Sequence, residues 1–186
     1  ITGRLISAKG IGYLVEAMPK VLRDYPAALF VFFGAGNCLP YQNRLREMGI
    51  ADRNYLFMGY LKEAKDLIYF YRGSSVFVAP TLYENLPIRV LEAMACGVPV
   101  VASSICAIPE VIDHGVNGML VHPGCVEELS ESICVLLGDP ALRKKIGDNA
   151  RKTVLDKFSW NVNAAKTLNV YQQISNNNCK KLVSVN

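Results

Sequence analysis

SSVFVAPTLYENLPIRVLEAMACGVPVVAS, residues Ser74 to Ser103, holds two apolar runs separated by a loop and a segment between Pro87 and Gly97. Proline is favoured in the first turn of a helix and glycine just after its last turn, so this segment is predicted to be a helix. The flanking runs show no polar alternation, which is typical of strands covered on both faces. A buried strand, a helix and a second buried strand predict a parallel sheet.

The same alternation continues along the chain. Apolar runs predict five strands, at residues 27–36, 54–59, 74–80, 98–103 and 118–122. Helical patterns occupy residues 10–26, 63–74, 87–96, 125–138, 140–155 and 160–174, and Pro19 is expected to kink the first. The fold class is therefore α/β, a Rossmann-like parallel sheet with helices on both faces. Ile1 and Thr2 are expected to end a first strand, Trp160 to anchor the last helix by packing, and residues 176–186 to form a flexible tail.

The composition limits the classes of protein to which this chain can belong. The chain has 186 residues, 51% of them hydrophobic and 19% charged, which suits one domain with a sizeable core. The sequence contains no apolar run long enough to cross a membrane. The net charge of +4 fits a mildly basic surface, or attraction to phosphates or to a lipid surface. No basic stripe interleaved with aromatics predicts nucleic-acid binding.

Cysteine and histidine spacing predicts no metal site. The six cysteines lack a CxxC pair, the two histidines fit no zinc pattern, and Asp-x-Asp is absent. Most cysteines stand beside apolar residues and are expected to be buried thiols of a reducing compartment. No signal peptide is evident at the beginning of the sequence, so a cytoplasmic location is predicted, with peripheral membrane contact as an option.

Ligands of doubly wound sheets bind at the carboxyl ends of the strands, so the loops there hold the candidate site. Arg4 and Lys9 precede a glycine-flanked helix start, which favours phosphate binding through side-chain charge and backbone N–H groups. The alternative is two solvated surface cations. Gly34 and Gly36 follow the most apolar strand and predict a tight turn where backbone approaches a ligand, or a plain turn. Leu39 stands where a dinucleotide fingerprint needs glycine or alanine, which disfavours a nicotinamide dehydrogenase.

Glu84 and Glu92 are the acidic candidates. They are eight residues apart, which is about 12 Å at a helical rise of about 1.5 Å per residue. Paired glycosidase carboxylates are closer, about 5 to 9.5 Å apart, so two separate hydroxyl-binding groups flanking a diphosphate fit better. The alternative is that Glu84 interacts with the helix dipole and Glu92 is a solvated helix residue.

These motifs together resemble the C-terminal, donor-binding domain of a retaining glycosyltransferase of the GT-B fold, in family 4. The likeness rests on GRLISAKGIGYLVEAM at the start, GAG, LFMGYL, the two glutamates followed by AMACGVPVVA, and IPEVIDHGVNGMLVHPG. Relatives often carry Gly-Phe-Gly after the first glutamate, whereas this chain has Asn85-Leu86-Pro87. Residues 1–175 would be the nucleotide-sugar donor-binding domain.

The resemblance implies a role for each matching residue. Arg4 and Lys9 would bind the donor diphosphate and stabilise it as it leaves, Glu84 would face the transferred sugar, and Glu92 would hold the ribose hydroxyls. Other donor contacts would come from backbone and loop residues: Gly34, Gly36, Gly59, Tyr60, Asn85, Leu86 and Ile88.

The resemblance also implies partners. The donor would be a nucleotide-diphosphate sugar, with no further cofactor and no metal required. The acceptor, a glycan or a lipid-linked molecule, would bind a separate N-terminal domain, and this domain alone would be inactive as a hexosyltransferase. A sugar-nucleotide epimerase of the same fold and a non-catalytic nucleotide-binding module are the alternatives.

Overall fold

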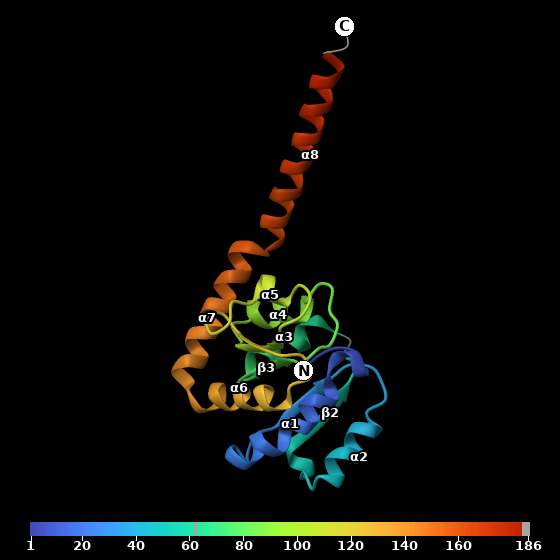
Figure 1. Cartoon of the computed structure of the whole chain (residues 1–186), viewed down its shortest axis with the longest axis vertical. Helices are drawn as coiled ribbons and strands as arrows, with labels where there is room; N and C mark the ends of the chain where they lie inside the picture. Colours follow the sequence, from blue (N-terminus) through green and yellow to red (C-terminus); the bar gives the residue numbers. More distant parts are fainter. Residues whose placement is uncertain (62, 184–186) are drawn as a thin grey trace.

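The computed structural model describes residues 1–61 and 63–183 (Figure 1). Five short strands form two parallel sheets, of order β1-β2 and β3-β4-β5. Their bounds are β1 Phe30–Phe33, β2 Tyr55–Gly59, β3 Phe77–Ala79, β4 Val100–Ser103 and β5 Met119–Val121. Each lies within one of the five predicted apolar runs, so these predictions are confirmed.

Residues 1–3 lie along the edge of β1. Residues 4–10, which lead from this segment to the helix that begins at Ile11, are called the first loop. Thr2 forms a parallel bridge with Phe33. The Gly3 N–H donates to the Phe33 carbonyl at 2.9 Å, and the Phe33 N–H donates to the Ile1 carbonyl at 3.1 Å. The prediction that Ile1 and Thr2 belong to a strand agrees with this pairing. A cavity of about 500 Å³, lined by residues of β1 and β3, lies between the two sheets.

Helices fill the intervals between the strands. Their bounds are α1 Ile11–Asp24, α2 Leu39–Glu47, α3 Ala64–Gly73, α4 Ile88–Ala95, α5 Ile108–Val111, α6 Val126–Gly138, α7 Pro140–Lys157 and α8 Trp160–Val183, with 3-10 turns η1 Ser7–Lys9 and η2 Asp52–Asn54. Pro19 lies inside α1, which continues to Asp24. The helix α2 was not predicted, because its sequence LPYQNRLRE buries only Leu45 and shows no apolar periodicity.

Alternate strand residues pack into two separate cores. Phe77, Val100 and Ala102 belong to a cluster with residues of α3, α4, α5 and α7. Val78 and Val101 belong to the other cluster, with residues of α1 and α6. Because successive side chains of a strand point to opposite faces, both faces of the sheet are covered. This confirms the predicted α/β class with helices on both faces. Among the described residues, no helix is both long enough and apolar enough to cross a membrane.

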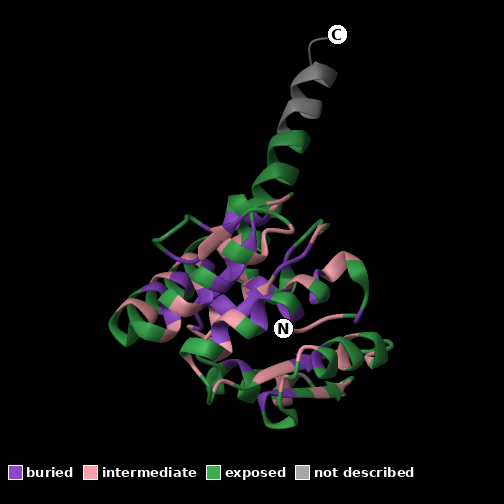
Figure 2. Cartoon of the chain, turned by 60° about the horizontal axis from the view of Figure 1, so that its bottom comes forward, coloured by how far each residue is buried: buried purple, intermediate pink, exposed green. Residues whose placement is uncertain are grey.

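Two expectations about the periphery, on Trp160 and on the cysteines, differ from the structure. Trp160 is 89% exposed rather than a packing anchor, because α8 projects away from the domain (Figures 1 and 2). The helix α8 continues through Val183, residues 184–186 lie outside the described part, and the flexible tail expected at residues 176–186 stays a prediction. The five cysteines whose side chains are described are free thiols, exposed at Cys106 and half-buried at the others.

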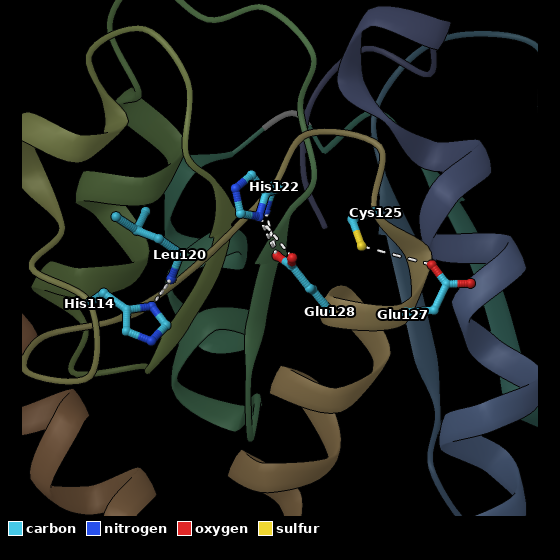
Figure 3. A network of polar contacts seen from close by, with 6 residues as sticks. All are labelled: His114, Leu120, His122, Cys125, Glu127 and Glu128. Carbon is cyan, nitrogen blue, oxygen red and sulfur yellow. Dashed lines mark hydrogen bonds and ion pairs between the residues drawn. The ribbon is translucent and has the colours of Figure 1, made fainter.

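The loop between β5 and α6 is held by a side chain from the first turn of the helix (Figure 3). Glu128 accepts a hydrogen bond from the backbone N–H of His122 at 2.8 Å, and its carboxylate also meets the His122 ring. The His122 N–H bond, and next the ring contact, lower the pKa of Glu128. The contact joins the carboxyl end of β5 to the first turn of α6.

A close backbone contact joins the first loop to the loop after β3. Gly10 adopts φ +68°, and a Cβ built on it would lie 1.6 Å from the carbonyl oxygen of Pro80. Only glycine fits here, since any side chain would both strain the backbone and overlap a carbonyl. The helix start at Gly10 therefore lies directly against the loop that leads to Glu84.

We expect Gly10→Ala to reduce the free energy of unfolding by about 2–4 kcal/mol, because the backbone must shift to remove the overlap with Pro80. Denaturant titration measures this change. Gly12→Ala is the matched control: it lies in α1 with nothing within 4 Å of its built Cβ. The free energy of unfolding of this control should be unchanged or higher by up to about 1 kcal/mol. Equal stability of the two variants would contradict the close-contact interpretation.

Candidate functional site

Hydrogen bonds hold the first loop and the loop after β3 together. The carbonyl of Ala8 accepts from the Leu82 N–H at 2.9 Å and from the Thr81 hydroxyl at 3.0 Å. Next to this junction, Lys9 Nζ donates to Glu84 Oε2 at 2.5 Å. Both side chains are about one-quarter exposed, 26% for Lys9 and 25% for Glu84. Two residues separated by 75 positions thus form an ion pair at the carboxyl end of β3.

The ion pair lines a cavity of about 270 Å³. Arg4 lines the same cavity, as do Leu86, Pro87 and Ile88 at the beginning of α4. The Ile88 N–H, the first of α4, donates to the Leu86 carbonyl at 2.8 Å. The next N–H groups of a first helical turn have no acceptor within the helix, so they are available to an anion placed there. Arg4, Lys9 and Glu84 therefore meet in one cavity.

A second cavity of about 350 Å³ adjoins the first. Four residues line both cavities: Thr2, Gly3, Arg4 and Arg89. Gly34, Tyr60 and Leu61, from the loops after β1 and β2, line only the second. We call the two adjoining cavities the strand-end hollow. It runs along the carboxyl ends of the strands, where ligands of such sheets bind.

Glu92 lies behind Arg89, which lines the hollow and forms an ion pair with it. It does not line either cavity among the described residues; its carboxylate accepts from Arg89 Nη1, at 3.1 Å to Oε1 and 2.8 Å to Oε2. The hydroxyl of Tyr71 lies 3.0 Å from Glu92 Oε2. The bond to Glu92 raises the pKa of the Arg89 guanidinium. Burial raises the pKa of the Tyr71 hydroxyl, and the Glu92 carboxylate raises it further.

The charges around the hollow favour an anion. Three cations, Arg4, Lys9 and Arg89, and two carboxylates, Glu63 and Glu84, line the hollow. Each nearby carboxylate already has a cation: Glu84 pairs with Lys9, Glu63 with Lys65 and Glu92 with Arg89. Within the described part of the chain the Arg4 side chain makes no ion pair, and it is exposed in the hollow. A guanidinium with free donors binds phosphate oxygens well, since its planar fork can make two parallel hydrogen bonds.

The glycines predicted for ligand approach lie close to the backbone and side chains of the first loop. A Cβ built on Gly34 would lie 1.7 Å from the carbonyl oxygen of Gly3, and one on Gly36 would lie 2.8 Å from Leu5. Their lack of side chains is therefore explained by packing against the first loop, and Gly34 lines the hollow as well. Gly59 and Asn85 do not line either cavity.

Arg89 and Tyr71 were not predicted. Arg89 stands three residues before Glu92, a spacing that places two helix residues side by side and could have indicated the pair. Tyr71 lies on α3, 21 positions from Glu92, and nothing local in the sequence indicates their contact. Among the described residues, no group of three or more His, Cys, Asp or Glu side chains is arranged to hold a metal ion.

Comparison with known proteins assigns the fold to a family. The model of the family described as Glycosyl transferases group 1 matches residues 1–139. An uncharacterized glycosyltransferase of Methanocaldococcus jannaschii is 39% identical over 171 residues, covering 91% of this chain and 43% of its own length. A GDP-mannose-dependent monoacylated alpha-(1-6)-phosphatidylinositol monomannoside mannosyltransferase of Corynebacterium glutamicum is 33% identical over 177 residues, covering 91% of this chain and 45% of its own length.

A solved structure supports the same assignment. The sucrose-phosphate synthase of Thermosynechococcus elongatus superposes with a TM-score of 0.83 at 28% identity, covering 92% of this chain and 44% of that one. The chain spans about half the length of the curated relatives that it matches. Since the family model matches residues 1–139, more than half of the chain, this chain belongs to the glycosyl transferases group 1 family, a family of sugar-transferring proteins with the GT-B type of fold.

Proposed function

We propose that this chain is the C-terminal, donor-binding domain of a retaining glycosyltransferase of family 4, and that the strand-end hollow binds a nucleotide-diphosphate sugar. The observation that supports this most is the Lys9–Glu84 pair at 2.5 Å, beside the exposed guanidinium of Arg4. The pair puts a cation for phosphate next to a carboxylate for sugar hydroxyls. A diphosphate-linked sugar presents both groups in that order.

The proposed roles follow from charge and position. Arg4, Lys9 and the free N–H groups in the first turn of α4 bind the diphosphate, and Glu84 accepts hydrogen bonds from the transferred sugar. Glu92 accepts from the ribose, and Tyr60 lies beside the base in the second cavity. Gly34, Gly36, Gly59, Asn85, Leu86 and Ile88 shape the loops around the donor.

The proposed reaction develops negative charge on the diphosphate. The bond between the sugar C1 and a phosphate oxygen breaks, a bond from C1 to an acceptor oxygen forms on the same face, and the acceptor proton passes to the departing phosphate. Cations and helix N–H groups placed at that phosphate stabilise the transition state more than the bound donor, because the charge grows there as the bond breaks.

The acceptor would bind a part of the enzyme beyond this chain, since the matched relatives are about twice as long. The exposed face of α8 is a surface suited to such a second domain: Trp160, Leu168 and Tyr171 are each more than half exposed and line one shallow hollow. The chain by itself is expected to bind the donor weakly and to transfer little. A glycan or lipid-linked acceptor, and a cytoplasmic location with peripheral membrane contact, stay predictions.

We expect Lys9→Ala and Glu92→Ala each to weaken the binding of nucleoside diphosphates by about tenfold, because each removes a charged hydrogen-bonding partner. Isothermal titration calorimetry with UDP, GDP and ADP measures the affinity. Lys20→Ala is the matched control, since Lys20 also pairs with a glutamate, Glu131, at 2.7 Å, outside the hollow. If both site variants keep the affinity of the control, the assignment of the site is wrong.

We expect the same nucleoside diphosphates to bind equally well with magnesium and in excess EDTA. The described residues supply cations but no carboxylate cluster to hold a metal ion, so the phosphate charge would be met by Arg4, Lys9 and backbone N–H groups. Calorimetry in the two buffers measures this. A loss of about tenfold or more in EDTA would show that a metal takes part in binding the diphosphate.

A further inference from the structure

Three polar side chains form a hydrogen-bonded row from the segment that pairs with β1 to α4. Thr2 Oγ1 lies 3.2 Å from the Tyr71 hydroxyl, and that hydroxyl lies 3.0 Å from Glu92 Oε2. An ionised carboxylate only accepts hydrogen bonds, so Tyr71 must donate its single proton to Glu92 and accept from Thr2. Both hydrogen bonds thus have an assigned direction. Thr2, at one end of this row of side chains, lines the strand-end hollow, and Arg89 lines it beside Glu92 at the other end.

Tyr71, the middle residue of this row, is held in place by the core. Tyr71 is only 3% exposed and belongs to the cluster that packs β3 and β4 against α4. Its ring meets the edge of Phe77 at a centroid distance of 5.5 Å and an interplanar angle of 75°. A tyrosine packed in this way cannot change rotamer without disrupting the core. Its hydroxyl therefore stays in one place and holds Glu92 Oε2 there.

The Arg89 contact is of a different kind. Its side chain is 48% exposed, and one nitrogen, Nη1, is shared between both oxygens of Glu92. An exposed arginine three residues away on one helix contributes little to fixing a carboxylate, because water competes and the long side chain is mobile. Oε2 thus has two donors, whereas Oε1 has only the longer contact to Arg89 and keeps a free lone pair.

We propose that Tyr71 is a positioning residue for ribose recognition, holding Glu92 Oε2 so that Oε1 faces the ribose hydroxyls. This rests on the proposed function, in which Glu92 accepts from the ribose. A carboxylate that is fixed at one oxygen loses less freedom when a ligand binds the other, so the hydroxyl that it meets contributes more to affinity. Removing the Tyr71 hydroxyl should therefore weaken discrimination between ribose and deoxyribose, in addition to overall affinity.

The test uses the intact chain and three pairs of probes, UDP with dUDP, GDP with dGDP and ADP with dADP, titrated by calorimetry. We expect the unmodified chain to prefer the ribonucleotide of a bound pair by about tenfold, and Tyr71→Phe to reduce this preference to about threefold or less. Tyr25→Phe is the matched control. Tyr25 donates its hydroxyl to the Cys134 carbonyl at 3.1 Å, outside the hollow, so its removal costs one hydrogen bond without touching Glu92.

The possible failures are distinguishable. Binding of none of UDP, GDP and ADP by the unmodified chain would reject the proposed function, and the role of Tyr71 with it. Binding with a ribose preference that Tyr71→Phe retains would overturn only the role of Tyr71, as would binding without any ribose preference. If Tyr71→Phe melts below the assay temperature, Thr2→Val replaces it. This variant removes the hydroxyl that donates to Tyr71 and is expected to reduce the preference for ribose from about tenfold to about threefold. An unchanged preference would then reject the proposal.

Discussion

The contact between the first loop and the loop after β3 is the constraint on which the site depends. The Ala8 carbonyl accepts two hydrogen bonds from Thr81 and Leu82, and Gly10 lies against the Pro80 carbonyl, where no side chain fits. Backbone contacts of this kind do not depend on side-chain rotamers. They set the separation of the Lys9 and Glu84 backbones before any ligand is present, and at that separation the two side chains can form an ion pair.

Two kinds of support surround the hollow. The loop contact positions Lys9 and Glu84, whereas the core positions Tyr71 and, through it, Glu92. Arg4 belongs to neither group, since its side chain is exposed and makes no ion pair within the described residues. A site built in this way fixes its carboxylates and leaves one guanidinium free to adapt. That division suits a ligand with defined hydroxyl positions and a more variable phosphate conformation.

The fold was largely predictable because its signals are local. Each strand lies in an apolar run, and Pro87 and Gly97 mark the ends of α4. The convergence of Arg4, Lys9 and Glu84 followed from the rule that loops at the carboxyl ends of parallel strands meet. The polar helix α2 was missed because propensity alone is a weak signal. Tyr71 was missed because its contact with Glu92 depends on the packing of α3 against the sheet, which no local pattern encodes.

The exposure of the site explains why binding and transfer should be separable. The Lys9 and Glu84 side chains are about one-quarter exposed, so water screens both their mutual attraction and their interaction with a bound anion. Covering the hollow would lower the local dielectric constant and strengthen each of these interactions at once. In the proposed reaction charge develops on the leaving diphosphate, so transfer would gain more from such a cover than binding would. A domain that presents the cations and carboxylates on an open face is therefore suited to hold a donor, while efficient transfer would need a second surface that closes over it.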